Sequence, residues 1–354
     1  MSRYWSRGIA ELEAYVPGEQ PQESGLVKLN TNENPNPPSP RVIEAIRAAA
    51  DGSLRLYPDP GCQRLKEAIA ACHGLTKEEI FVGNGSDEIL AFAFGAFFDH
   101  GEPVLFPDVT YSFYPVYARF FKLEAGLVAV NEDFSLPVSG FLRPNGGIVF
   151  PNPNAPTSLA LSLDAIRRIL DHNLAIGRVV VVDEAYVDFG AESALPLLAE
   201  HPNLLVVRTL SKSSSLAGLR VGYAMGGREL IEGLERVKSS INSYTVDRLA
   251  MAGAVAAIED IDHLGRNVAK ICATRERVSR ELRSLGFSVA DSKANFLFIG
   301  HEGYRASELY SRLKERKVLV RYWDKARIAN RLRVSVGTDE EMELFLKALR
   351  EVAG

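Results

Sequence analysis

The chain has 354 residues, 46% of them hydrophobic and 24% charged, which is enough for one large domain and a smaller companion. Its 41 basic and 45 acidic side chains give a net charge of −4, which argues against nucleic acid as a partner. The three cysteines and six histidines form neither a disulfide framework nor a ligand spacing, so no metal site is predicted. Without an N-terminal apolar region or a run of about 18 apolar residues, we expect a cytoplasmic protein that contacts no membrane.

The N-terminal part of the chain is polar and ends in a run of asparagines and prolines. This composition predicts an irregular N-terminal arm over residues 1–38. Ser39 followed by Pro40 indicates the start of a helix, and Gly52 indicates its end. A second helix is predicted over residues 62–74.

From residue 80 to residue 210, apolar runs alternate with helical patterns. The predicted helices cover residues 87–98, 112–121 and 163–172. The predicted strands cover residues 80–83, 103–106, 124–130, 146–150, 178–186 and 203–210. Uninterrupted apolar runs are typical of strands buried on both faces, and strand–helix alternation predicts a mainly parallel sheet. We therefore predict an α/β fold whose large domain, residues 39–245, has its sheet sandwiched by helices.

The pattern changes after Gly227, where helical segments dominate as far as about residue 284. Short strands then interleave with helices, at residues 287–290, 295–300, 318–323 and 331–337. This pattern predicts a smaller α+β domain at the C-terminus, over residues 246–354.

Ligands of an open α/β sheet bind beyond the carboxyl ends of its strands, so polar residues at these ends are the candidates. Gly85, Ser86 and Asp87 follow one strand and open an apolar helix, where free backbone amides can hold a phosphate. The same residues also fit an ordinary helix N-cap. Asp183 follows four valines, and its carboxylate needs either a salt bridge or the protonated ring nitrogen of pyridoxal phosphate.

Lys212 follows a further strand, in the Ser-rich stretch RTLSKSSSLAGLR. Taken alone, it fits a solvated lysine of a loop. Beside a buried acid and a phosphate-binding turn, it is predicted to be a nucleophile that forms a Schiff base. Arg220 would bind a phosphate with two of its nitrogens, together with Ser211 and Ser213.

These motifs and others in the same order resemble the fold-type I pyridoxal-phosphate aminotransferases, specifically their histidinol-phosphate aminotransferase branch. The resemblance covers nearly the whole chain and rests on AYVPGE at 14–19, LNTNENP at 29–35, YPDP at 57–60, GNGSDE at 83–88, PDVTY at 107–111, PNPNAPTS at 151–158, DEAY at 183–186, TLSKSSSLAGLRVGY at 209–223 and RLRVSVGT at 331–338. It implies a fold-type I transferase with pyridoxal 5'-phosphate as its cofactor.

The resemblance implies that three residues carry the chemistry. Lys212 would hold the cofactor covalently and move a substrate proton, Asp183 would hold the ring nitrogen, and Tyr186 would bond the ring oxygen. The other cofactor contacts would come from Gly85, Ser86, Asp87, Tyr111, Asn154, Ser211 and Arg220. Tyr57 of the partner subunit would reach the cofactor phosphate, which implies a homodimer.

The residues that the resemblance assigns to the substrate are Tyr15, Asn32, Arg321 and Arg333. The guanidinium fork of arginine matches the geometry of phosphate and carboxylate groups. The alternative for the two arginines is that they are surface charges on edge strands.

One position departs from the family pattern. The family usually has asparagine before Pro-Thr, beside the cofactor ring oxygen, whereas Ala155 stands here and Asn154 lies one position earlier. Either the loop aims Asn154 at the ring oxygen, or Tyr186 and water alone serve it.

The resemblance implies a transaminase that converts histidinol phosphate and 2-oxoglutarate to imidazole acetol phosphate and glutamate, in histidine biosynthesis. An aromatic amino-acid aminotransferase and a threonine-phosphate decarboxylase are the alternatives, because the same scaffold serves both. A non-catalytic effector sensor would need an additional basic DNA-binding domain, and here the fold is expected to begin within the first thirty residues.

Overall fold

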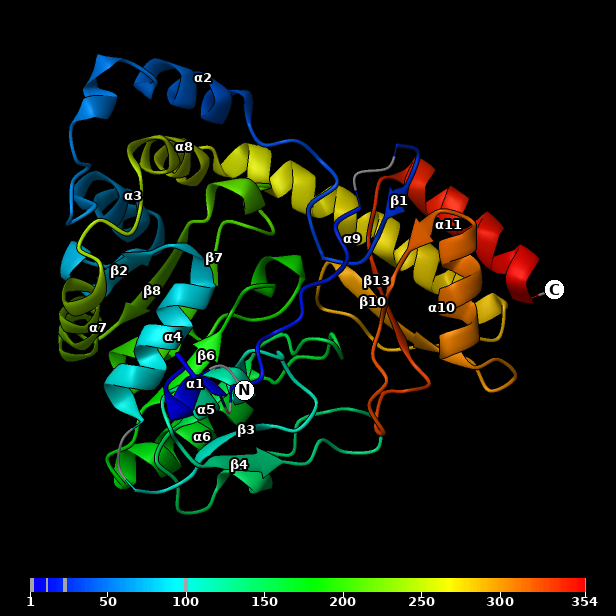
Figure 1. The fold of residues 1–354 in the computed structure, drawn as a ribbon, viewed down its shortest axis with the longest axis horizontal. Helices are drawn as coiled ribbons and strands as arrows, with labels where there is room; N and C mark the ends of the chain where they lie inside the picture. Colours follow the sequence, from blue (N-terminus) through cyan, green and yellow to red (C-terminus); the bar gives the residue numbers. More distant parts are fainter. Residues whose placement is uncertain (1–2, 11, 22–23, 99–100, 354) are drawn as a thin grey trace.

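The computed structural model describes residues 3–10, 12–21, 24–98 and 101–353. A large unit and a smaller one lie side by side, and the long helix α9 (Ile261–Ser284) runs from the first toward the second (Figure 1). The short helix α1 (Arg7–Ala10) lies beside the large unit, and the C-terminus lies at the far end of the small one. The chain therefore has the two-part organisation that the sequence predicts.

Seven strands form the sheet of the large unit, in the order β2-β8-β7-β6-β5-β3-β4. Five neighbouring strands run parallel, namely β3 (Val104–Pro107), β4 (Ala125–Val128), β5 (Ile148–Pro151), β6 (Val180–Asp183) and β7 (Leu204–Thr209). β8 (Gly222–Gly226) is antiparallel to both of its neighbours, β7 and β2 (Ile80–Gly83). The prediction of a mainly parallel α/β sheet is confirmed.

β8 is a strand of this sheet that the sequence pattern did not predict. Two of its five residues are glycines, which have no side chain to pack and are unfavourable in strands. Gly222 is nevertheless required, because a Cβ atom there would lie 2.5 Å from the backbone nitrogen of Ser86. The glycine thus brings β8 against the turn that precedes α4 (Gly85–Phe97).

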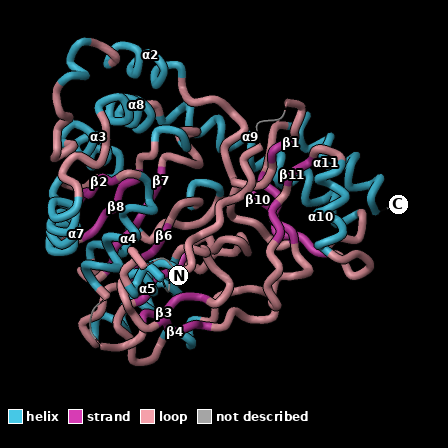
Figure 2. Tube along the Cα trace, in the orientation of Figure 1, coloured by secondary structure: helices cyan, strands magenta, loops and turns pink. Residues whose placement is uncertain are grey.

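Helices cover both faces of the sheet (Figure 2). Val180 and Val182 of β6 belong to one core, together with residues of α2 (Pro40–Ala49), α3 (Gln63–His73), α6 (Leu163–Ala175) and α8 (Arg248–Glu259). Val181 points the other way and packs with residues of α4, α5 (Tyr114–Phe120) and α7 (Arg228–Ile241). Because both faces are buried, polar side chains are concentrated beyond the ends of the strands.

The first predicted helix start is confirmed at Ser39, whose hydroxyl accepts a hydrogen bond from the backbone N–H of Arg41. α2 ends at Ala49, before the predicted Gly52. The difference arises because Gly52–Arg55 forms a separate 3₁₀ turn, which is capped by the side chain of Asp51.

The small unit contains an antiparallel sheet in the order β12-β13-β10-β9. Its strands are β9 (Ser288–Val289), β10 (Phe296–Gly300), β12 (Arg321–Tyr322) and β13 (Leu332–Ser335). Their apolar residues share one core with α9, α10 (Ala306–Glu315) and α11 (Asp339–Ala353). The predicted smaller α+β unit is confirmed.

The two units are connected at two places, through the N-terminal arm and through the passage from α8 to α9. β1 (Val27–Lys28) pairs in parallel with β11 (Val318–Leu319), so residues of the N-terminal arm join the small unit. Ala250 and Ala254 of α8 belong to the core of the large unit. The domain limits at residues 38 and 245 stay a prediction, and this packing favours a later limit, between α8 and α9.

Two features are not found in the part of the chain that the structure describes. None of its helices combines the length and apolarity that crossing a lipid bilayer requires. None of its clusters of histidine, cysteine, aspartate and glutamate is placed to hold a metal ion. The three cysteines, Cys62, Cys72 and Cys272, all lie within the described ranges and are free thiols.

Candidate active site

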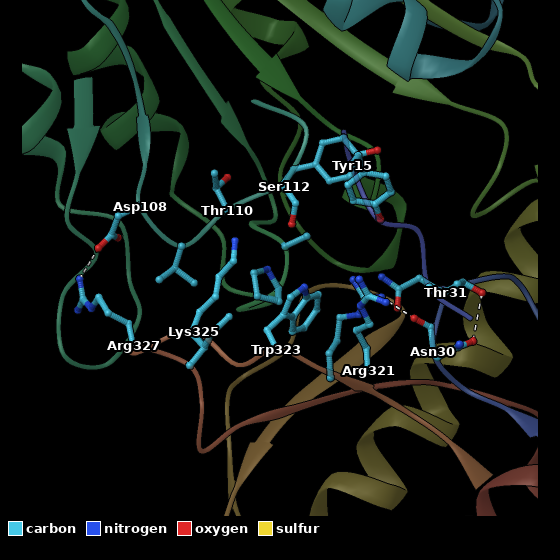
Figure 3. Close-up of a pocket in the computed structure, with 18 of the residues that line it drawn as sticks. Tyr15, Asn30, Thr31, Asp108, Thr110, Ser112, Arg321, Trp323, Lys325 and Arg327 are labelled. Atoms are coloured by element: carbon cyan, nitrogen blue, oxygen red, sulfur yellow. Dashed lines mark hydrogen bonds and ion pairs between the residues drawn. The ribbon is translucent and has the colours of Figure 1, made fainter. Parts of the chain in front are cut away.

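A cavity of about 290 Å³ lies between the two units, at the carboxyl ends of the parallel strands. Loops that follow β3, β5, β6 and β7 form one wall, and the N-terminal arm and the segment from β12 to β13 form the other (Figure 3). Seven residues that the sequence assigned to a site line this cavity: Tyr15, Asn32, Tyr111, Tyr186, Lys212, Arg321 and Arg333. Residues far apart in the sequence therefore meet at the sheet edge where ligands are expected.

Lys212 lines the cavity, just after β7. Its Nζ donates a hydrogen bond of 3.1 Å to the backbone oxygen of Thr31 and lies 5.7 Å from the centre of the Tyr186 ring. The hydroxyl of Tyr186 accepts a hydrogen bond of 3.0 Å from the Asn32 amide. Within the described residues, no carboxylate forms an ion pair with Lys212, so its amine is available to a ligand.

Asn32 is held firmly, although its backbone has the unusual φ of 56°. Its side-chain oxygen accepts a hydrogen bond from the hydroxyl of Ser335, its backbone N–H donates to the same hydroxyl, and its backbone oxygen accepts from Asn295. The arm and the small unit thus fix the amide that reaches Tyr186.

Asp183 ends β6 and is almost completely buried, with 4% of its surface exposed. Its carboxylate accepts hydrogen bonds of 3.1 Å from the hydroxyl of Tyr114 and from the backbone N–H of Ala185. Burial outweighs these two bonds and raises the pKa of Asp183 to about 7. Because no cation of the described chain forms an ion pair with Asp183, a bound ligand with a cationic group would stabilise the carboxylate.

A second group of polar residues joins the cavity through Tyr111. The hydroxyl of Tyr111 donates 2.7 Å to one oxygen of Asp87, and a nitrogen of Arg220 lies 3.0 Å from the other. Arg220 also donates a long bond of 3.4 Å to the hydroxyl of Ser211. Gly85 has a φ of 78°, and a Cβ there would lie 2.6 Å from Arg220. The start of α4 and Arg220 thus form the kind of cradle that binds an anion.

Ser213 does not belong to this group. Its hydroxyl donates to Asp188, which also forms an ion pair with Arg208. The expectation that Ser213 faces a phosphate is therefore wrong, because its hydroxyl donates its hydrogen bond to the carboxylate of Asp188. Arg208 binds Glu184 through two nitrogens, so this network ties together the chain segments that carry Asp183 and Lys212.

Arg321 and Arg333 lie opposite Lys212, on paired positions of β12 and β13. They donate only to backbone oxygens of the arm, Arg321 to Val16 and Pro17, and Arg333 to Asn30. The Nε of Arg333 is buried without a partner, and burial lowers the pKa of its guanidinium. Both arginines lack a carboxylate partner among the described residues and are prepared to bind an anion.

Trp323 and Tyr15 line the cavity beside the two arginines. The centre of the Trp323 ring lies 5.2 Å from the guanidinium carbon of Arg321 and 5.1 Å from that of Arg333. The ring of Tyr15 stacks on Phe113 with 4.2 Å between the ring centres. The arm therefore contributes an aromatic side chain to the wall of the cavity.

Asn154 lies away from the cavity, contrary to the expectation that it contacts the cofactor. The side chain is fully buried, and its amide donates to the backbone oxygen of Val109 and the hydroxyl of Thr157, while its oxygen accepts from Thr110. These bonds hold the loop that follows β5. The neighbouring Ala155 lines the cavity instead. Of the two alternatives, the structure favours the one in which Tyr186 serves the ring oxygen without an asparagine.

Tyr57 does not reach the cavity of its own chain. It is 78% exposed, and its ring stacks on that of Tyr244 with 4.6 Å between the centres. The resemblance assigns this residue to the site of a partner subunit, and its exposure agrees with that role.

Sequence reasoning missed several residues of the site. Tyr114, the donor to Asp183, comes one helical turn after Tyr111, and this spacing is the signal that would have found it. Trp323 ends the strand predicted at residues 318–323 and Lys325 follows it in an irregular segment, and no periodicity there points to a site. Asp108 directly follows β3, so the expectation that polar residues at the carboxyl ends of strands contact a ligand also applied to it.

Together these residues can do four things. Lys212 can react as an amine or carry a proton, Asp183 can hold a cationic ring, and the Gly85 to Arg220 cradle can hold a phosphate. Arg321 and Arg333 can bind a second anion at the far side of the cavity. A ligand that combines a phosphate with a basic ring, next to an anionic substrate, fits this arrangement.

Comparison with known proteins agrees with the geometry. The family model described as aminotransferase class I and II matches residues 24–349. The chain is 55% identical to a histidinol-phosphate aminotransferase of Clostridium acetobutylicum, over 99% of both chains. It is 54% identical to histidinol-phosphate aminotransferase 1 of Bordetella parapertussis, again over 99% of both.

A solved structure resembles the fold as a whole. The histidinol-phosphate aminotransferase of Sinorhizobium meliloti, in complex with pyridoxal-5'-phosphate, superposes with a TM-score of 0.87 at 26% sequence identity. The superposition covers 100% of this chain and 98% of that one. The fold, the arrangement of the site and these relatives all agree. The chain belongs to the aminotransferases of class I and II and, within them, to the histidinol-phosphate aminotransferase family.

Proposed function

We propose that the protein is a pyridoxal-phosphate-dependent transaminase that moves the amino group of histidinol phosphate to 2-oxoglutarate. The products are imidazole acetol phosphate and glutamate, and the reaction belongs to histidine biosynthesis. The observation that carries the proposal is the buried Asp183, which has no cation of the described chain as a partner and ends the strand beside the one that Lys212 follows. The relatives at 51–55% identity have the same substrate in their names.

The residues present fit the cofactor. Pyridoxal phosphate supplies an electron sink for the negative charge that develops beside the transferred amino group. Asp183 holds the ring nitrogen, and burial makes this carboxylate bind a cation strongly. Tyr186 would bond the ring oxygen, and Tyr111 would pack against the ring.

The phosphate of the cofactor is held by the cradle at the start of α4. The backbone of Gly85, Ser86 and Asp87 donates to it, with Arg220 and Ser211 on the other side. Arg220 pairs with Asp87 at 3.0 Å, which orients its guanidinium next to the backbone amides.

Lys212 would hold the cofactor covalently and, when free, would move a proton at the carbon that bears the amino group. Its contact with the Thr31 oxygen places the amine toward the substrate side of the cavity. Arg321 and Arg333 bind the anionic end of the substrate, Asn32 orients Tyr186, and Tyr15 covers the substrate. Water is thereby kept from the reacting carbon.

An absorbance titration tests the choice of substrate. Histidinol phosphate is expected to bleach the visible band of the bound cofactor at lower concentration than phenylalanine or tyrosine, and 2-oxoglutarate is expected to restore it. Release of glutamate is measured in the same mixture. Carbon dioxide from threonine phosphate, without glutamate, would instead show a decarboxylase, and a preference for phenylalanine would show an aromatic aminotransferase.

We also propose a homodimer in which Tyr57 of the partner subunit reaches the cofactor phosphate. Leu54, Leu56 and Tyr57 are 54%, 51% and 78% exposed and close together in the sequence, and Tyr57 stacks on Tyr244. Replacing Leu54 and Leu56 together by glutamate is expected to give a monomer with weaker cofactor binding, measured by sedimentation and fluorescence. Leu344→Glu, at a comparably exposed leucine of α11, is the control. A monomeric parent protein would contradict the proposal.

We place the enzyme in the cytoplasm. The three cysteines are free thiols, which agrees with a reducing compartment. Cell fractionation checks this, and recovery in a membrane or secreted fraction would refute it.

A further inference from the structure

Lys325 is a basic residue of the cavity whose role neither the sequence motifs nor the proposed reaction explains. It lines the cavity from the irregular segment between β12 and β13, and its side chain extends from that segment toward Thr110 (Figure 3). Within the described ranges, no side chain forms a hydrogen bond or ion pair with its ammonium group. A cation in a binding cavity without a partner is available to an anionic ligand.

The charge around Lys325 is not balanced by the protein. Basic side chains line the cavity at five positions, Lys212, Arg321, Lys325, Arg327 and Arg333, against one carboxylate, Asp108. Asp108 is already satisfied, because one oxygen lies 2.8 Å from Arg327 and the other accepts the backbone N–H of Val130. The positive charge of Lys325 therefore remains for the ligand.

The cavity has two separate positive regions. Arg321 and Arg333 form the first, and Trp323 packs against both guanidinium groups. Lys325 forms the second, on the other side of the Trp323 ring in Figure 3. Two cationic regions on either side of an apolar ring match a ligand with two anionic ends and an apolar middle.

The two substrates of the proposed reaction differ in this respect. Glutamate and 2-oxoglutarate each carry two carboxylates, whereas histidinol phosphate carries one anionic group and an imidazole. Arg321 and Arg333 can bind one anionic group of either substrate. Only the dicarboxylates have a second anion for Lys325.

We propose that Lys325 is a specificity-determining residue that binds the distal carboxylate of glutamate and 2-oxoglutarate. The inference rests on the proposed transaminase function. Lys325 distinguishes the two halves of the reaction, because it donates a charge-assisted hydrogen bond to the dicarboxylate. Histidinol phosphate gains no comparable bond from it.

Lys325→Met, which keeps an unbranched side chain of similar size and removes its charge, tests the proposal. Each half-reaction is followed separately through the cofactor absorbance. The apparent Kd of glutamate and of 2-oxoglutarate is expected to rise about 10- to 100-fold, the loss of one hydrogen bond to a charged group. The Kd of histidinol phosphate is expected to change less than about threefold, and Lys325→Arg is expected to restore most of the affinity for the dicarboxylates. Lys347→Met, at an exposed lysine of α11, controls for the loss of one charge.

A second measurement does not depend on turnover. Glutarate, a dicarboxylate that cannot react, is expected to bind Lys325→Met more weakly than the parent protein in calorimetry, while butyrate is expected to bind both equally. Equal weakening for all ligands, or weakening for histidinol phosphate alone, would overturn the proposal. If the parent protein does not react with histidinol phosphate, the proposed function fails, whereas the comparison of glutarate with butyrate still decides the role of Lys325.

Discussion

Replacing Lys212 by arginine is expected to lower the transamination rate by at least about 10²- to 10⁴-fold, the range that a lost proton-transfer group usually costs. Arginine keeps the positive charge but stays protonated at any physiological pH, so it can neither bind the cofactor covalently nor take up a proton. The bond from residue 212 to the Thr31 oxygen does not depend on that chemistry. The rate is measured as glutamate formed from histidinol phosphate and 2-oxoglutarate.

The control for this substitution is Lys347→Arg, at an exposed lysine of α11, which is expected to keep the full rate. A Lys212→Arg protein that binds the cofactor without a covalent bond would retain its thermal unfolding temperature within a few degrees. If it kept more than about a tenth of the parent rate, Lys212 would not carry the proton and the assignment of the site would be wrong.

Asp183→Asn is expected to have opposite effects on the protein with and without cofactor. In the cofactor-free protein the pKa of Asp183 is about 7, above the ordinary value of about 4 for an aspartate. Between these values the folded chain keeps a proton that the unfolded chain releases, so the free energy of unfolding falls as pH rises. Asparagine carries no charge, so it avoids the cost of burying an unpaired carboxylate. The substitution is expected to raise the free energy of unfolding of the cofactor-free protein by on the order of 2–4 kcal/mol above pH 7.

The holoenzyme is expected to respond in the other direction. There the carboxylate would face the protonated ring nitrogen, so its loss is expected to remove a buried ion pair and most of the catalytic rate. Denaturant titrations of both forms at pH 5 and pH 8 measure the two effects, with Asp291→Asn, at a side chain that is 75% exposed, as the control. Equal stability of cofactor-free Asp183→Asn and parent protein at pH 8 would refute the expectation.

The strand ends were the part of the site that the sequence predicted best. Asp183 and Lys212 both follow runs of buried aliphatic residues, and parallel strands place such residues at one edge of the sheet without any detailed geometry. Gly85 was predictable for a similar reason, because glycine before an apolar helix is a local signal. The resemblance to a family added Arg321 and Arg333, which their own neighbourhood would not have revealed.

Three features could not be read from the sequence, each for a physical reason. β8 has little strand propensity, because its glycines serve a close backbone contact at Ser86 rather than packing. Asn154 could be placed only once the loop was seen, since its partners lie on another loop at Val109 and Thr110. Lys325 lies in an irregular segment, where only the fold decides which side chains face the cavity.

The bond between Arg327 and Asp108 makes the cavity a property of both units together. Arg327 comes from the small unit and also donates to the Val130 oxygen of the large one. The residues assigned to the cofactor belong to the large unit, whereas the cations assigned to the substrate's anionic ends all belong to the small unit. We therefore expect the bound cofactor to slow the amide hydrogen exchange of the large unit. A bound dicarboxylate is expected to slow exchange in the segments where the two units meet.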